Sequence, residues 1–125
     1  MENRLIKILV VDDELLICEL LDEFLSHKGY QVTTATDGKE ALRKFEKERP
    51  HIILLDIKMP GVSGVEVLRR IKEIDSDTVV IMITALGDMD TVQNTQKIGA
   101  DDYLMKPIDL GHLEKILVTW QKRFI

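Results

Sequence analysis

The sequence places five residues that can do phosphoryl chemistry at the ends of short apolar runs: Asp12, Asp13, Asp56, Thr84 and Lys106. Three carboxylates with open positions around them suit Mg²⁺, which prefers oxygen ligands and keeps several waters. An ionised carboxylate beside Mg²⁺ can attack a phosphoryl group and form an acyl phosphate without a general base. A hydroxyl and an ammonium can cover the remaining phosphoryl oxygens. The pattern therefore predicts phosphoryl transfer to a carboxylate.

The apolar runs alternate with stripes of helical spacing. The expected strands are 5–11, 30–35, 52–55, 79–83 and 102–105. The expected helices start near Ile17, after the caps Asp37 and Ser63, near Asp88 and after the cap Asp109. This alternation predicts a parallel sheet with helices on both faces.

The carboxyl ends of parallel strands lie at one edge of a sheet, where ligands bind. We therefore expect the five residues to converge at that edge. Taken singly, Asp12 could be a solvated acid and Asp13 a helix cap, so the hypothesis depends on the five residues meeting. Asp56 is harder to explain in this way, because it ends a buried run and precedes a turn.

The composition bounds the class of protein. The chain has 125 residues, 17 basic and 22 acidic side chains, and a formal net charge of −5. This length predicts one domain over 1–125. The acidic balance argues against direct nucleic-acid binding, and no apolar run is long enough to cross a membrane. A single cysteine, Cys18, fits a cytoplasmic protein.

Longer stretches around the candidate residues carry a more specific pattern: 8–13 (ILVVDD), 54–61 (LLDIKMPG), 83–85 (ITA), 99–103 (GADDY) and 106–107 (KP). In this order and spacing the whole chain resembles the receiver domain of two-component response regulators. The resemblance implies a flavodoxin-like (βα)5 fold with a doubly wound parallel sheet in strand order 2-1-3-4-5. It also implies a phosphorylation-activated signalling domain that is not an enzyme, beyond its own phosphotransfer and autodephosphorylation.

The resemblance assigns a role to each candidate residue. Asp56 is expected to accept a phosphoryl group from the phosphohistidine of a sensor histidine kinase or a histidine phosphotransfer protein. The implied Mg²⁺ ligands are Asp12, Asp13, Asp56 and the main-chain carbonyl of Lys58. Thr84 and Lys106 are expected to contact the phosphoryl group.

The resemblance also implies a switch. Tyr103 occupies the aromatic switch position and is expected to turn inward as Thr84 moves toward the phosphoryl group. The output surface is expected to comprise the helix over 88–98, the strand over 102–105 and the helix after Asp109. It would contact a downstream output domain or a target protein. Phosphorylation-dependent dimerisation stays open, since the last helix lacks the Arg-rich pattern of dimerising winged-helix regulators.

Three finer expectations concern the same end of the chain. The helix over 88–98 has a thin apolar stripe, essentially Val92 and Ile98, so it is the element expected to shift. Our hypothesis for Leu86, two residues beyond Thr84, is that it limits water access and slows autodephosphorylation. The bond before Pro107 resembles the cis peptide of the family.

Several alternatives are weighed against the receiver. A haloacid-dehalogenase-type phosphatase also uses an aspartate nucleophile and Mg²⁺, but its Asp-x-Asp pattern is missing here. A flavodoxin-like electron carrier would need a Ser/Thr-rich phosphate loop, and a degenerate receiver would lack some of the five residues. The chain could be a stand-alone receiver or the N-terminal receiver of a longer regulator.

Other chemically interesting side chains have plainer interpretations. We expect the three histidines to be ordinary surface residues, since their spacing suits no metal site: His27, His51 and His112. Cys18 is expected to be a structural thiol off the main apolar stripe of its helix. Trp120 is expected to belong to the core rather than to anchor a partner.

Overall fold

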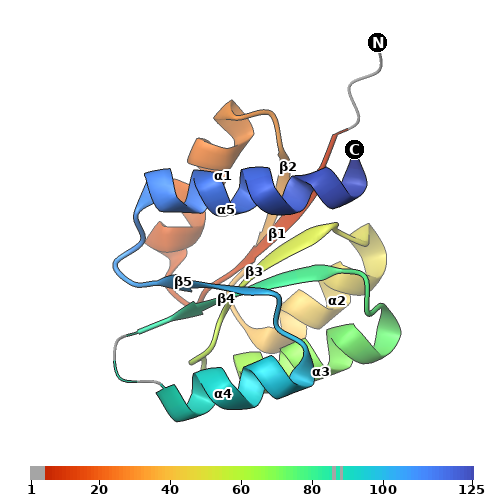
Figure 1. The fold of residues 1–125 in the computed structure, drawn as a ribbon, viewed down its shortest axis with the longest axis vertical. Helices are drawn as coiled ribbons and strands as arrows, with labels where there is room; N and C mark the ends of the chain where they lie inside the picture. The colour runs from red at the N-terminus through yellow and green to blue at the C-terminus, as the bar shows by residue number, and fades with distance from the viewer. Residues whose placement is uncertain (1–4, 86, 88) are drawn as a thin grey trace.

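The computed structural model describes residues 5–85, 87 and 89–125 (Figure 1). Its strands are β1 (Lys7–Val11), β2 (Gln31–Ala35), β3 (Ile52–Asp56), β4 (Val79–Thr84) and β5 (Asp102–Met105). Its α-helices are α1 (Leu15–His27), α2 (Gly38–Glu48), α3 (Gly64–Ile74), α4 (Met89–Ile98) and α5 (Leu110–Gln121), and a short 3₁₀ helix, η1 (Lys122–Phe124), follows. Strands and helices alternate throughout.

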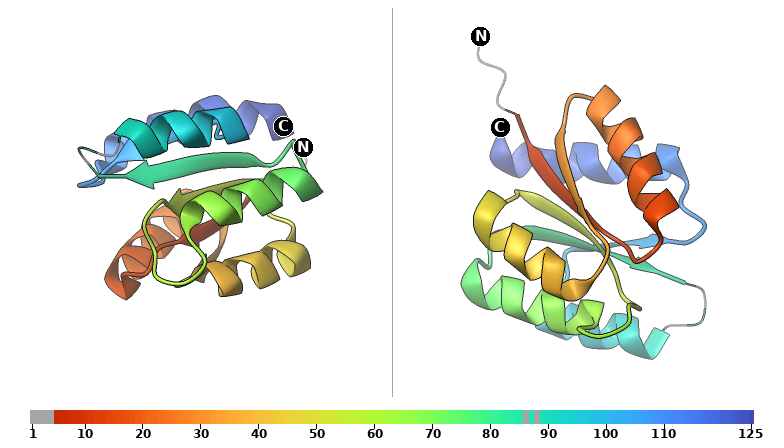
Figure 2. Two further views of the ribbon diagram at one scale, coloured as in Figure 1. Left: turned by 90° about the horizontal axis from the view of Figure 1, so that it is seen from below. Right: turned by 180° about the vertical axis from the view of Figure 1, so that it is seen from behind.

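The five strands form one parallel sheet in the order β2-β1-β3-β4-β5. Helices flank this sheet on both sides (Figure 2). The predicted flavodoxin-like fold and strand order are therefore confirmed. Within the described part of the chain, no helix is both long and apolar enough to span a lipid bilayer.

The central strands are apolar throughout because both faces of the sheet are covered. Ile8 and Val10 of β1 belong to a core shared with α1 and α5. Their neighbours Leu9 and Val11 belong to a second core shared with α2 and α3. Successive strand side chains point to opposite faces, so a strand between two helical layers is apolar at every position. Polar groups are left to the strand ends, where the candidate site lies.

Side-chain caps fix three of the helix starts. The predicted caps Asp37, Ser63 and Asp109 each accept a hydrogen bond from the backbone N–H three residues later. Helix α1 starts differently, since its N-cap residue, Glu14, makes no side-chain cap hydrogen bond. Asp13 therefore does not cap α1, and its carboxylate is left for the acidic cluster.

The expectation for His51 was wrong, and that for Cys18 was wrong in its placement on the helix. His51 is half-buried rather than a plain surface residue: its Nδ1 accepts a hydrogen bond from the N–H of Lys7 at 2.9 Å, and its ring lies 5.0 Å from that of Phe124. Cys18 lies on the buried face of α1 and not off its apolar stripe, but its thiol, which donates to the carbonyl of Asp12 at 3.3 Å, is buried as a structural thiol would be. Isolated single residues carry too little periodic signal for such placements.

The next expectations concern the C-terminal half of the chain. The Lys106–Pro107 peptide bond is cis. Trp120 packs half-buried against the core of α1 and α5, as predicted. Leu86 and Asp88, which carry the water-access hypothesis and the expected start of a helix, lie outside the described residues.

Candidate functional site

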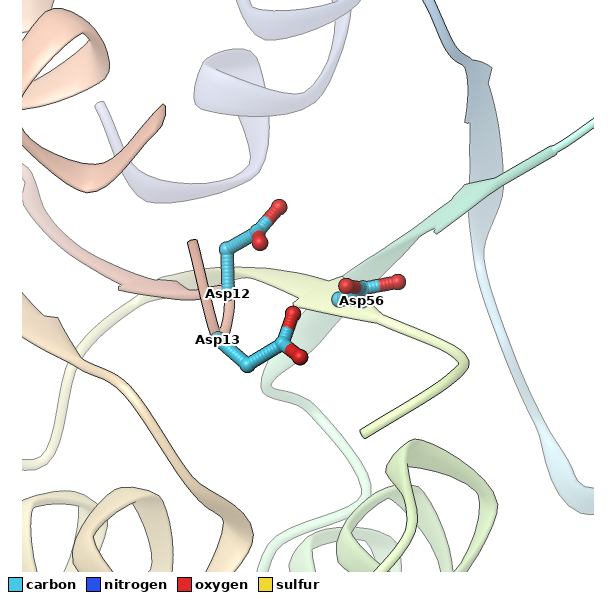
Figure 3. Close-up of side chains that lie close together, drawn as sticks. All are labelled: Asp12, Asp13 and Asp56. Carbon is cyan, nitrogen blue, oxygen red and sulfur yellow. The ribbon is translucent and has the colours of Figure 1, made fainter. Parts of the chain in front are cut away.

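The three aspartates meet at the carboxyl ends of β1 and β3. These strands are parallel neighbours with Val11 opposite Leu55, so the residues that follow in each chain segment lie side by side. Each aspartate offers a carboxylate oxygen within 4.8 Å of those offered by the other two (Figure 3). Asp12 and Asp56 are buried, whereas Asp13 is exposed to solvent. The arrangement is a cluster with one open side.

The contacts of the Asp12 carboxylate indicate whether this cluster fits a cation. Its Oδ1 accepts a hydrogen bond from the N–H of Glu14 at 2.9 Å. Its Oδ2 is buried and accepts no hydrogen bond from the described residues, although the Lys106 ammonium lies 3.2 Å away as an ion-pair partner. A buried carboxylate oxygen without a hydrogen bond is rare in proteins, and a bound ion is one way in which such an atom is satisfied. All the side-chain donors are hard oxygens, so the residues fit a hard divalent cation.

Lys106 is the cation that the sequence placed at this edge. Its Nζ lies 3.2 Å from Asp12 Oδ2, 3.3 Å from Asp56 Oδ2 and 3.5 Å from Glu14 Oε1. Burial lowers the pKa of Lys106, but the Asp56 and Asp12 carboxylates outweigh that effect and raise the pKa overall. The ammonium therefore stays protonated and partly offsets the charge of the acids.

Asp56 is the most perturbed acid of the cluster. Burial and then the neighbouring Asp12 carboxylate raise its pKa from 3.8 to about 6, against the opposing effect of Lys106. Burial also raises the pKa of Asp12. At neutral pH these carboxylates are ionised in surroundings that disfavour their negative charge. A bound cation would stabilise the ionised forms.

The remaining predicted residues make different contacts. Lys58 donates its backbone N–H to Asp56 Oδ1 at 3.3 Å. Thr84, the last residue of β4, is buried, and its hydroxyl donates to the carbonyl of Ala85 at 3.3 Å. Tyr103 of β5 turns its hydroxyl to α4, not to Thr84. The structure thus gathers the acids and Lys106 closely and leaves Thr84 and Tyr103 engaged with other groups.

Two residues of the site were not singled out from the sequence. Glu14, the third acid in the run after β1, shares the Lys106 ammonium, and that run was the available signal. Gly64 is the first residue of α3, where an added Cβ would lie 2.1 Å from the carbonyl oxygen of Asp56 and 2.9 Å from Cα of Ile57. These are backbone atoms that cannot rotate away, so α3 approaches the Asp56 backbone this closely only with glycine.

We expect Gly64→Ala to disturb Asp56 directly. The added methyl group must push either α3 or the Asp56 carbonyl, which should cost about 1–3 kcal/mol of stability, as overpacking does. Mg²⁺ binding, followed by titration, should weaken at the same time. The control is Gly29→Ala: Gly29 has φ 97° and no atom near its Cβ position, so the substitution strains only a loop. Equal Mg²⁺ affinity in the two variants would contradict the role of Gly64.

The comparisons with known proteins agree on one family. The response regulator receiver domain family matches residues 8–118. Sporulation initiation phosphotransferase F of Bacillus subtilis (strain 168) is 43% identical over 107 residues, 86% of each chain. Probable transcriptional regulator ycf27 of Cyanophora paradoxa is 45% identical over 114 residues, 91% of this chain but only 47% of that protein. A response regulator receiver domain protein from Clostridium thermocellum has a crystal structure with a TM-score of 0.90 at 36% identity, covering 95% of this chain and 96% of that one.

Proposed function

This chain belongs to the response regulator receiver domain family, and on that premise we propose that Asp56 is the phosphoacceptor of a signalling switch. The observation that carries the proposal is the Asp56 carboxylate itself, which is buried, lies 3.3 Å from the Lys106 ammonium and shares a cluster with two further acids. The phosphatase alternative has no support, since the matched family is a receiver family.

The proposed step is a transfer that needs no general base. An ionised oxygen of Asp56 attacks the phosphorus of the donor and forms a new P–O bond. The bond from phosphorus to the donor atom breaks, and the donor leaves with that electron pair. Lys106, already beside Asp56 Oδ2, balances the charge on the phosphoryl oxygens. Thr84 would exchange its hydrogen bond to the Ala85 carbonyl for one to the phosphoryl group.

We propose Mg²⁺ as the cation of the cluster. Its ligands would be Asp12, Asp13, Asp56 and the main-chain carbonyl of Lys58. Support comes from the Asp12 Oδ2 atom, which is buried without a hydrogen bond among the described residues, and from the all-oxygen side-chain set. When bound, Mg²⁺ supplies positive charge to the acids and to the incoming phosphoryl oxygens.

The raised pKa of Asp56 predicts that Mg²⁺ binding depends on pH. A proton and the cation compete for this carboxylate, whose pKa in the metal-free protein is about 6. Mg²⁺ affinity should therefore be nearly constant above pH 7 and about tenfold weaker at pH 5. Calorimetric titration across this range would measure the change. In Asp56→Asn the decline between pH 7 and pH 5 should be much shallower, and an equally steep decline would contradict the assignment of the proton to Asp56.

A small phosphodonor tests the function directly. Incubation with acetyl phosphate and Mg²⁺ should add one phosphoryl group by intact mass, and peptide mapping after reduction of the acyl phosphate should place it on Asp56. Chelation of Mg²⁺ should prevent the addition. Continuous hydrolysis of unrelated phosphate esters, or a phosphoryl group on another residue, would overturn the proposal.

The physiological partners follow from the same proposal. The donor would be the phosphohistidine of a sensor histidine kinase or of a histidine phosphotransfer protein. The output surface would be α4, β5 and α5, acting on a downstream output domain or a target protein, with Tyr103 as the switch residue. This surface carries three exposed apolar side chains that a partner could cover: Met89, Met105 and Val118. Residues 1–125 would act as one receiver domain.

A further inference from the structure

Helix α4 turns a threonine, not an aliphatic side chain, into the protein. Thr95 is 0% exposed and is the one fully buried residue of α4, while Val92 and Ile98 are only half-buried. Its hydroxyl oxygen lies 2.8 Å from the carbonyl oxygen of Val92 and 2.8 Å from the hydroxyl oxygen of Tyr103. The Tyr103 hydroxyl also reaches the Val92 carbonyl, at 3.1 Å. Three polar atoms therefore satisfy one another beneath the helix.

The hydroxyl protons of this group hold Tyr103 to α4 in each possible arrangement. Two hydroxyl protons serve three contacts, and the Val92 carbonyl can only accept. Either one hydroxyl donates to the other, or both donate to the Val92 carbonyl, which has two lone pairs. If the Tyr103 side chain left, the Thr95 hydroxyl, which is 0% exposed in this structure, would lose one of its two partners. A buried polar group that loses a partner costs more than an exposed one, so the two side chains favour each other.

Among the described residues, polar contacts anchor the chain at the C-terminal end of α4. Just beyond its C-terminus, Asp101 accepts hydrogen bonds from the Lys72 ammonium of α3 and the Val80 N–H of β4, each at 2.8 Å. The Lys72 and Asp101 side chains are 11% and 16% exposed, so this ion pair is well shielded from solvent. At the opposite end Met89 is 67% exposed. In the part of the chain that the structure describes, the Thr95–Tyr103 contact ties α4 to β5 at a point that precedes this anchor in the sequence.

We propose that Thr95 is a positioning residue for Tyr103, whose hydroxyl it ties to α4 so that the side chain and the helix move together about the anchored segment 99–101. The link is a property of the unphosphorylated protein. Only the event that moves it, phosphoryl transfer to Asp56, rests on the proposed function. Tyr103 then acts on the output surface through α4 as well as through its own exposure.

Hydrogen exchange of the α4 amides tests the link without phosphorylation. The variants are Thr95→Val, which keeps the shape and removes the hydroxyl, Tyr103→Phe, and the two combined. Each single change should speed exchange of the α4 amides about 5- to 10-fold, because local opening becomes easier by one hydrogen bond. The double variant should speed exchange by less than the product of the two single effects, since the contact between the two hydroxyls is lost in both single variants. Amides of β1 and β3 should be unaffected.

Two controls separate positioning from general packing. Thr95→Ser restores the hydroxyl and should exchange like the wild type, although it lacks the methyl group. Thr91→Val makes the same chemical change one turn earlier on α4, at a residue that makes no contact with Tyr103 among the described hydrogen bonds, and should also leave exchange unchanged. The proposal would be overturned if the double variant sped α4 exchange by the full product of the two single effects. It would also be overturned if α4 exchange in Thr95→Val were as slow as in the wild type.

A phosphorylated arm distinguishes this inference from the proposed function. Acetyl phosphate with Mg²⁺ should change α4 exchange in the wild type, and the change should be at least halved in Thr95→Val but kept in Thr95→Ser. If the wild type takes up no phosphoryl group, the proposed function fails while the result of the double-variant comparison still stands. If the wild type responds and Thr95→Val responds equally, the proposed function stands and the positioning role of Thr95 is wrong.

Discussion

Asp56→Asn should raise the free energy of unfolding of the metal-free protein at pH 7 by about 2–3 kcal/mol, while abolishing phosphoryl uptake. The gain comes from the pKa of Asp56, which burial and Asp12 raise from 3.8 to about 6 in the folded state. At pH 7 the folded protein therefore holds an ionised group in a place that disfavours its charge. Asparagine keeps the shape and removes that charge. Urea unfolding would measure the stability, and intact mass after acetyl phosphate treatment would measure the loss of uptake.

The gain in stability from Asp56→Asn should depend on pH. Because the pKa of Asp56 is higher in the folded state, this carboxyl contributes its full stabilisation below its unfolded pKa of 3.8. That contribution to the free energy of unfolding is lost as the pH rises through about 6. The stability difference between Asp56→Asn and the wild type should therefore be largest above pH 7 and nearly vanish at pH 4. Saturating Mg²⁺ should also reduce it, because the cation stabilises the wild type selectively.

Asp13→Asn is the matched control for charge. It removes one acid from the same cluster, but Asp13 is exposed, so its stability effect should stay within about 0.5 kcal/mol. Equal stabilisation by the two variants would mean that net charge, rather than the burial of Asp56, is responsible. Retained phosphoryl uptake in Asp56→Asn would contradict its assignment as phosphoacceptor.

The sheet and its polar edge could be predicted because they depend on strong, repeated signals. Five apolar runs separated by helical stripes leave few topologies, and parallel strands must bring Asp12, Asp56 and Thr84 to one edge. Helix starts at Asp37, Ser63 and Asp109 could be predicted because a cap is a local interaction over three residues. The strand order itself came from the family resemblance.

Contacts between distant side chains could not be predicted in this way. The thin apolar stripe of α4 pointed to Val92 and Ile98, yet the fully buried residue is Thr95, whose partner Tyr103 lies on another element. Periodicity counts apolar residues and therefore misses a buried hydroxyl that is paired with another hydroxyl. Gly64 could not be singled out either, since the sequence does not show which backbone atoms approach it.

Lys106→Met should slow phosphoryl uptake about 100-fold and at the same time strengthen Mg²⁺ binding. The opposite signs follow from the position of the ammonium, 3.2 Å from Asp12 Oδ2 and 3.3 Å from Asp56 Oδ2. It repels a second cation from these two oxygens, yet it is also the side-chain cation next to the attacking carboxylate. Initial rates with acetyl phosphate and calorimetric Mg²⁺ titrations would measure the two effects, at pH 8 so that the pKa of Asp56 does not interfere.

The comparison with Lys47→Met decides whether position or net charge is responsible. Lys47 is exposed in the last turn of α2 and its loss changes the net charge equally. A distant surface charge is screened within about 10 Å at ordinary ionic strength, so this variant should match the wild type in both measurements. Weaker Mg²⁺ binding in Lys106→Met would mean that the ammonium orders the acids for the cation rather than competing with it. An unchanged phosphorylation rate would remove Lys106 from the transfer step, although it would leave Asp56 as the acceptor.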